Sequence, residues 1–203
     1  MKKSGTVVFL ICGLLLICNT VFAGELLDAR FYFDRGNTHY NDGQYDNAIQ
    51  SYSQAITTDP NFAQAYHNRG LAYYKKGMFD EAIADYGKVI SLNVQNAEIY
   101  RNRGIAYLRK GLYGDAIEDY SRVIALSPNA VDAYHNRGIA YANTGKYDEA
   151  VTDYNKALSL KPNEVNVYAS RGVAYTKKAM ADFKKACDLG NQNACENLKQ
   201  LSK

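Results

Sequence analysis

The chain has 203 residues, enough for one large domain or one array of repeats. Its 24 Lys and Arg nearly balance its 21 Asp and Glu, so the net charge of +3 does not indicate a nucleic-acid-binding protein. Hydrophobic residues make up 47% and charged residues 22%, which excludes an intrinsically disordered chain. Only 3 prolines accompany 18 tyrosines, and so few prolines disfavour a loop-rich all-β fold and permit many helices.

The N-terminus has the order of residues that is typical of an export signal. Two lysines precede an apolar run over residues 6–18, and Ala23 follows at the position where signal peptidases accept a small residue. We therefore expect residues 1–23 to be a signal peptide and the protein to be exported, to the periplasm of a Gram-negative bacterium. Two alternatives stay open. One is an uncleaved anchor, although the run is short for a membrane-spanning helix; the other is lipid attachment at Cys18, which lacks the small preceding residue of a lipobox.

From residue 29 onward the sequence repeats at a constant interval, which equals the separation of Gly36 from Gly70. This repetition accounts for most of the tyrosines. Three columns keep the period through five repeats: Tyr32, Tyr66, Tyr100, Tyr134 and Tyr168; Arg35, Arg69, Arg103, Arg137 and Arg171; Gly36, Gly70, Gly104, Gly138 and Gly172. Three more run through four repeats: Gly43, Gly77, Gly111 and Gly145; Ala48, Ala82, Ala116 and Ala150; Tyr52, Tyr86, Tyr120 and Tyr154. Within each repeat a glycine separates two stretches with helical apolar spacing, which predicts two amphipathic helices joined by a turn.

The arginine column is accompanied by a column of carboxylates on the predicted second helices, which comprises Asp85, Asp119, Asp153 and Asp182. We expect the arginines to pair with carboxylates on neighbouring helices, because a regular charge column in a repeat is usually structural. The alternative, a basic stripe that binds a ligand, stays open. The glycine column that includes Gly104 is expected to let the two helices of a repeat approach closely.

These residues resemble the tetratricopeptide repeat family over roughly residues 29–190. The resemblance implies an all-α fold, a right-handed superhelical solenoid of about five helix-turn-helix repeats followed by a C-terminal capping helix. The repeats are expected at 29–62, 63–96, 97–130 and 131–164, with a shortened fifth repeat at 165–190 and the capping helix at 191–203.

The fifth repeat lacks its turn. The interval from Tyr175 to Phe183 is shorter by five residues than the interval from Tyr107 to Tyr120, which stand at the corresponding positions. The five missing residues are those of the turn, and the apolar stripe continues across the gap with helical spacing. We therefore predict a single fused helix near 165–189, with a retained tight turn at Lys177–Lys178 as the alternative.

The segment from Ala186 to Cys195 is similar to cysteine-rich Sel1-like repeats. That resemblance implies a disulfide between Cys187 and Cys195, which would fasten the terminal helix. Redox activity is the competing interpretation, but the chain has no C-x-x-C motif. Two cysteines without a nearby histidine cannot make a closed zinc site.

The family resemblance also implies a concave groove, lined by the first helices, that binds a protein or a peptide. The contact columns of the family carry over to Phe33, Asn37, Tyr40, His67, Leu71, Tyr74, Lys75, Arg101, Ile105, Leu108, Arg109, His135 and Ile139. They predict an aliphatic stripe with a basic patch at Lys75, Arg101 and Arg109, suited to a peptide with apolar side chains and some negative charge. The alternative is that part of the stripe serves only the packing between repeats.

No pattern in the sequence indicates catalysis. The chain carries no nucleophile elbow, phosphate loop or metal-ligand cluster, so we expect no enzyme activity and no cofactor. The predicted function is an exported adaptor or scaffold that binds a protein or peptide, with no nucleic-acid partner. A membrane-tethered assembly factor of the cell envelope and a binder of cell-wall glycan are the alternatives. Membrane association is expected only through the N-terminus, and self-association is left open.

Overall fold

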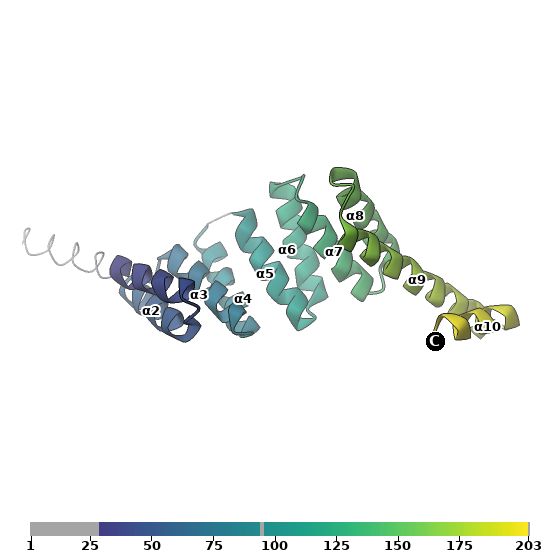
Figure 1. The fold of residues 1–203 in the computed structure, drawn as a ribbon, viewed down its shortest axis with the longest axis horizontal. Coiled ribbons are helices and arrows are strands. Elements are labelled where there is room, and N and C mark those ends of the chain that lie inside the picture. The colour runs from purple at the N-terminus through teal and green to yellow at the C-terminus, as the bar shows by residue number, and fades with distance from the viewer. Residues whose placement is uncertain (1–28, 94–95, 203) are drawn as a thin grey trace, which may run out of the picture. The chain divides into compact units, whose positions relative to one another are not determined.

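The computed structural model describes residues 29–93 and 96–202. The expected signal peptide, residues 1–23, lies outside these residues. In the described parts of the chain all regular secondary structure is helical (Figure 1). The chain divides into two compact units at residues 94 and 95, and each unit is described by itself.

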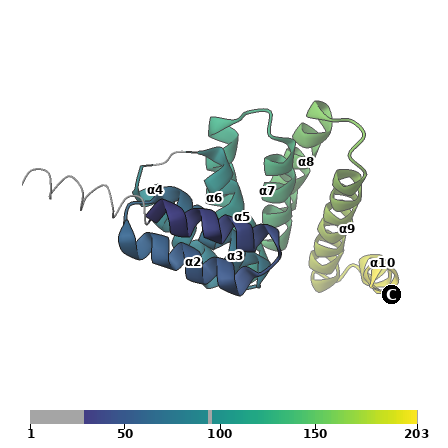
Figure 2. The same cartoon turned by 60° about the vertical axis from the view of Figure 1, so that its left-hand side comes forward.

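Unit 1 contains two consecutive helical pairs. The described part of its first helix covers residues 29–41 and is followed by α2 (Tyr45–Thr58), α3 (Ala63–Lys75) and α4 (Phe79–Ser91). Each helix packs against its neighbour in the sequence, as α2 does against α3 (Figure 2). We call the helix over 29–41 and α3 the first helices of their repeats, and α2 and α4 the second helices.

Unit 2 continues the alternation and then departs from it. Its first helices are α5 (Ala97–Lys110) and α7 (Val131–Asn143), and its second helices are α6 (Tyr113–Leu126) and α8 (Tyr147–Leu160). Then come α9 (Val165–Asp188) and α10 (Gln192–Leu201).

A glycine with a positive φ angle ends the first helix of each complete repeat. Gly111 directly follows α5 with φ of 75°, in the left-handed region that residues with a side chain rarely adopt. Gly43, Gly77 and Gly145 have φ angles between 75° and 79°. The glycine turns predicted from the sequence are therefore present, and they reverse the chain so that the two helices of a repeat lie antiparallel.

The interior of each repeat combines small residues with one large ring. The tyrosines of the second helices are at most 1% exposed, and the alanine column beside them is 0% exposed; these residues are Tyr52, Tyr86, Tyr120 and Tyr154 with Ala48, Ala82, Ala116 and Ala150. Each tyrosine ring lies against a glycine of the first helix. A Cβ atom added to Gly138, for example, would lie 2.5 Å from Cε1 of Tyr154. The close approach predicted for the glycine column is confirmed in the four complete repeats.

Bidentate ion pairs join the two helices of three repeats. Arg137 donates from Nε and Nη2 to the two carboxylate oxygens of Asp153, at 2.8 Å each. Arg69 pairs in the same way with Asp85, and in the first repeat Arg35 donates to Ser51 at 3.1 Å instead. The predicted pairing of the arginine column with carboxylates is thus confirmed for the second, third and fourth repeats, and the column does not form a free basic stripe there.

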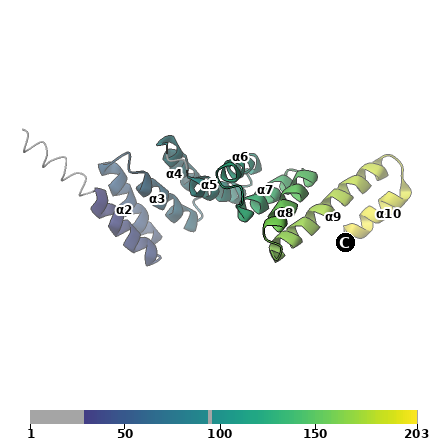
Figure 3. The same cartoon turned by 90° about the horizontal axis from the view of Figure 1, so that it is seen from above.

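The fifth repeat is one uninterrupted helix. α9 runs through the position where the turn would stand, as the missing five residues predict. Its first half packs against α8, and α10 folds back along its last turns (Figure 3). Cys187 of α9 is paired with Cys195 of α10, with a Cα–Cα distance of 4.8 Å.

Candidate functional site

The first helices of unit 1 form a surface pocket of about 380 Å³. Its lining comprises Asn37, Tyr40, Asn41, Tyr52, Asn68 and Leu71. Polar contacts organise the pocket: Tyr52 Oη and Asn68 Nδ2 both donate to Asn37 Oδ1, at 2.8 and 2.7 Å. Burial raises the pKa of Tyr52 to about 12. Each asparagine carries an amide that can donate and accept, which suits the backbone of a bound chain.

A second pocket, of about 260 Å³, lies in unit 2 between α7 and α9. Its lining comprises Ile139, Ala142, Asn143, Tyr154, Ala169, Ser170, Val173 and Lys177. Ile139 and Val173 stand in the same columns as Asn37 and Leu71 of the first pocket, three repeats further along the sequence. Ile139 therefore stands where the first pocket has the amide of Asn37, and Lys177 adds a positive charge at one side.

His135 stands beside the second pocket and supports one of its walls. Its Nε2 lies 3.0 Å from Oγ of Ser170, and its ring packs against Tyr154 with 5.9 Å between the centroids. Burial lowers the pKa of His135, so the imidazole is neutral at physiological pH. The residue therefore positions Ser170 and carries no charge to a ligand.

Four of the residues predicted for the groove lie at these pockets. Asn37, Tyr40 and Leu71 line the pocket of unit 1, and Ile139 lines that of unit 2. The prediction missed Tyr52 and Tyr154, because the columns carried over from the family include only positions on first helices. It also missed Asn68 and Ser170, which share a first-helix column that was not carried over. The buried tyrosine of a second helix completes each pocket, and the recurrence of that tyrosine in the sequence is the signal that could have indicated it.

Phe33 does not line a groove as predicted. It is 8% exposed, and its ring packs between Phe62, at 4.9 Å between centroids, and Tyr52, at 5.9 Å. An aromatic side chain at this position gains more from burial between helices than from exposure to water. Phe33 therefore belongs to the core of unit 1.

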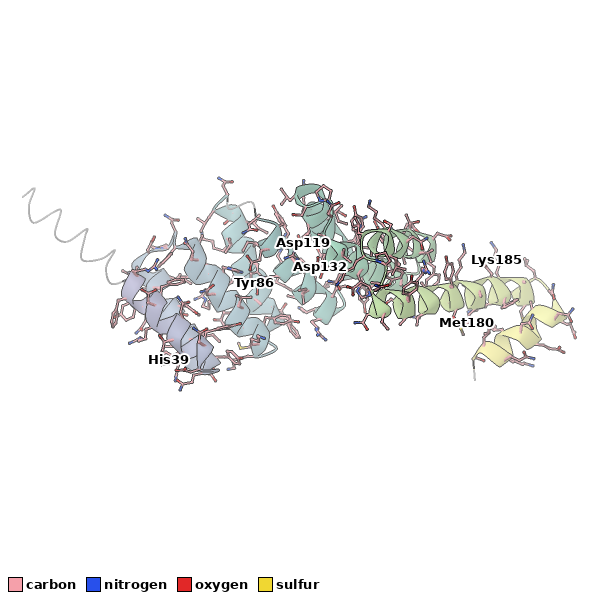
Figure 4. All side chains as sticks on the ribbon, turned by 45° about the horizontal axis from the view of Figure 1, so that its top comes forward. His39, Tyr86, Asp119, Asp132, Met180 and Lys185 are labelled. Atoms are coloured by element: carbon pink, nitrogen blue, oxygen red, sulfur yellow. A yellow bond between two sulfur atoms is a disulfide. The ribbon has the colours of Figure 1, made fainter. Side chains whose placement is uncertain are left out.

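The predicted basic patch is reduced by an ion pair. Arg101 Nε lies 2.7 Å from Oδ2 of Asp132 on α7, so the charge of Arg101 is balanced within unit 2. Asp132 is labelled in Figure 4. Arg109 is exposed in unit 2, and Lys75 is exposed in unit 1.

The remaining predicted residues contact neighbouring helices. Ile105 and Leu108 pack against the buried cluster around Tyr120. The rings of Tyr74 and His67 lie 5.4 Å from that of Phe79 and 6.1 Å from that of Tyr86. All four are partly buried. They agree with the alternative that part of the stripe serves packing.

The described residues offer no group of three or more His, Cys, Asp or Glu side chains that could hold a metal ion. Within the same residues no helix combines the length and apolarity that crossing a membrane requires.

Comparisons with known proteins agree with this geometry. A family model described as TPR repeat matches residues 36–77, 72–111 and 110–145, and one described as tetratricopeptide repeat matches 131–164. The chain thus belongs to the tetratricopeptide repeat family, a class of all-α proteins built from helical repeats. A search of curated proteins gave no match.

Solved structures share the fold over most of the chain. A crystal structure of MamA protein is 29% identical with a TM-score of 0.72, covering 86% of this chain and 90% of that one. A second MamA structure is 30% identical with a TM-score of 0.68, covering 82% and 91%. YrrB, titled a TPR protein with an unusual peptide-binding site, is 23% identical with a TM-score of 0.68, covering 83% and 90%, and it shows the fold alone.

Proposed function

We propose that this protein is a non-catalytic interaction scaffold whose pockets, one in unit 1 and one in unit 2, each bind an extended segment of a partner protein. Membership of the tetratricopeptide repeat family and the all-α repeat fold support the general role. The observation that carries the specific proposal is the pair of pockets at equivalent repeat positions, around Asn37 and Leu71 in unit 1 and around Ile139 and Val173 in unit 2.

The linings of the two pockets indicate the chemistry of the bound segment. The amides of Asn37 and Asn68 can hydrogen-bond to the backbone of an extended chain, which lacks internal partners for its own N–H and C=O groups. Ile139 and Val173 favour an apolar side chain. Lys177 favours a neighbouring negative charge. The proposed ligand of the unit 1 pocket is therefore the backbone of an extended segment, and that of the unit 2 pocket is a segment with an apolar side chain beside an acidic residue.

Crosslinking in intact cells, followed by mass spectrometry, tests this proposal. The wild type is compared with Leu71→Glu and Val173→Glu, each of which places a carboxylate in one pocket. Ala84→Glu, at an exposed position of the second helix α4, is the control with the same charge change. We expect the wild type and the control to capture the same protein and each pocket variant to capture less of it while remaining helical by circular dichroism.

Binding to the purified scaffold then has to follow the same pattern. Synthetic peptides that tile the captured protein are titrated against the wild type, both pocket variants and the control. For each pocket, one peptide should bind the wild type and the control, and bind the variant of that pocket more weakly. Equal binding by all four proteins overturns the assignment of these pockets. Retention on isolated cell wall that survives both substitutions would instead support a glycan ligand.

We further propose that the scaffold is exported and that residues 1–23 are removed. The order of lysines, apolar run and Ala23 supports export, and so does the pairing of Cys187 with Cys195. Intact mass of the protein from a fractionated cell tests the proposal: a soluble periplasmic form that begins at Gly24 is expected. A full-length form in the membrane fraction indicates an uncleaved anchor, and a lipid-modified form indicates attachment at Cys18.

A further inference from the structure

The two halves of α9 carry the two matching surfaces of one repeat. Its first half has the residues by which a first helix receives its second helix: Tyr168, Arg171, Gly172 and Tyr175. Its second half has the residues that a second helix supplies: Ala179, Asp182, Phe183 and Ala186, at the positions of Ala116, Asp119, Tyr120 and Val123 of α6. In a complete repeat these two surfaces meet across the glycine turn.

Within a single copy the two surfaces of α9 cannot meet. Arg103 reaches Asp119 because the chain reverses between them. Arg171 and Asp182 lie on one continuous helix with about three turns between them, hence about 16 Å apart along its axis. The same stiffness keeps Phe183 away from Gly172.

The receiving surface of the first half is consequently open. A Cβ atom added to Gly172 would meet nothing within 4 Å, although the same atom on Gly138 would meet a tyrosine ring at 2.5 Å. Tyr168 and Tyr175 are 49% and 50% exposed. Their counterparts in the preceding repeat, Tyr134 and Tyr141, are partly buried.

Arg171 has one half of the usual hydrogen-bond pattern of its column. Its Nη1 donates to Asn155 of α8 at 2.6 Å, just as Nη1 of Arg137 donates to Ser121 of α6 at 3.0 Å. Arg137 also holds Asp153 further along the chain, whereas the residue at the same offset from Arg171 is Cys187. A carboxylate on a helix that lies against Arg171 would complete the pattern.

The supplying surface of the second half is open as well. α10 packs against α9 and is attached to its second half through Cys187, the counterpart of Ile124. Met180 marks this part of α9 in Figure 4. Asp182 is exposed, and Phe183 is only partly buried whereas Tyr120 is 0% exposed.

We propose that two copies of this protein pair through their α9 helices, antiparallel and with two-fold symmetry. The second half of α9 in each copy packs on the first half in the other, which builds two composite fifth repeats. The register follows from the complete repeats: Arg171 pairs with Asp182 of the second copy, and Phe183 of the second copy lies on Gly172. Such an exchange is the expected outcome when the loop between two matching elements is too short to close.

The charges near the centre of this interface permit the pairing. The two-fold axis passes close to Lys177, whose side chain lines the pocket of unit 2 and so lies away from the stripe of Tyr175 and Ala179. Lys178 forms an ion pair with Asp148 of α8 in its own copy. The proposal uses a different surface from the peptide pockets and does not rest on the proposed function.

Charge exchange between copies is the first test. The protein is expressed with its N-terminal segment and purified in the form that the cell accumulates. Light scattering coupled to size-exclusion chromatography then measures its mass. We expect a dimer for the wild type. Arg171→Asp and Asp182→Arg each place like charges together at both contacts, and each should raise the dissociation constant by about tenfold or more.

An equimolar mixture of these two variants should recover the dimer, because only a contact between copies can restore both opposite-charge pairs. A wild type that is monomeric at high micromolar concentration overturns the proposal. So does a mixture that dimerises no better than either variant alone.

Restoring the turn is the second test. The variant carries Gly-Leu-Tyr-Gly-Asp, the sequence of residues 111–115, inserted between Lys178 and Ala179. The insertion makes the interval from Tyr175 to Phe183 equal to the interval from Tyr107 to Tyr120. The inserted chain can close its own fifth repeat, so we expect a folded monomer. A dimer that persists after the insertion shows that another surface holds the copies together and overturns the proposal.

Discussion

Arg103 and Asp119 face each other across the two helices of one repeat. Arg103 Nε and Nη2 donate to the two oxygens of a carboxylate that is 3% exposed, at 2.8 and 2.7 Å. These hydrogen bonds raise the pKa of Arg103, while burial raises the pKa of Asp119 against the opposing effect of the bidentate contact. The pair is a fixed internal element of the repeat.

Removal of one partner should therefore be costly. Arg103→Leu leaves the carboxylate of Asp119 buried without its counter-charge, and we expect the free energy of unfolding to fall by about 3–5 kcal/mol. Urea denaturation measures the effect. Arg122→Leu, an exposed position on α6, is the control and should change the stability by less than about 0.5 kcal/mol. The double variant Arg103→Leu/Asp119→Leu should recover most of the loss; an unchanged stability of Arg103→Leu alone would contradict the structural role.

The contact between Gly138 and Tyr154 predicts a strong effect from one methyl group. In Gly138→Ala the new Cβ would lie 2.5 Å from the ring, so the helices must separate, at a cost of about 1–3 kcal/mol. Gly114→Ala, on α6 with nothing within 4 Å, should be neutral or stabilising by at most about 1 kcal/mol. Thermal unfolding distinguishes the two, and equal melting temperatures would refute the close approach.

Alkaline pH should unfold the protein through its buried tyrosines. Burial raises the pKa of Tyr52 and of Tyr154 from 10.0 to about 12, so the folded state holds these protons more tightly than the unfolded state does. The stabilisation is complete below pH 10 and is lost as the pH rises towards 12, by about 2–3 kcal/mol for each tyrosine. Urea denaturation across this range measures the slope.

Tyr154→Phe should make the slope shallower, and Tyr175→Phe, at a residue that is 50% exposed, should leave it unchanged. If the two variants have the same slope as the wild type, buried tyrosine ionisation does not cause the loss of stability.

The pairing of Cys187 with Cys195 predicts the behaviour of α10. Exported protein should have an intact mass lower than that of the reduced form by two hydrogen atoms. The bond closes a short loop and should stabilise the docked α10 by about 2–3 kcal/mol. Reduction should therefore accelerate amide exchange over 192–201 while exchange in α6 stays unchanged. Two free thiols in the exported protein would exclude the bond.

The repeat architecture is accessible to sequence reasoning because its determinants are local. A glycine at a fixed offset predicts the turn at Gly111, and the arginine and aspartate columns predict the pair of Arg103 with Asp119, since each interaction lies within one period. The loss of five residues before Ala179 likewise predicts the continuous α9. In each case the local sequence pattern is compatible with a single structure.

The groove was harder to predict because position in a repeat does not determine exposure. Phe33 and His67 occupy the same column, yet Phe33 is buried by Phe62, a neighbour that the column does not reveal. Arg101 stands in a column that is predicted to line the groove, but its charge is balanced by Asp132 on α7, the next first helix. The tyrosines that complete the pockets come from second helices, so a list of first-helix positions could not include them.

The ion pair, the contact between glycine and tyrosine and the glycine turn of a complete repeat all lie inside one period of the sequence. Duplication or deletion of a whole period would therefore lengthen or shorten the protein without orphaning a buried charge. Removal of a few residues inside a period has a different result, which the fifth repeat shows: the complementary surfaces survive but are held apart. Natural variants of this chain are thus expected to differ in length by multiples of the repeat.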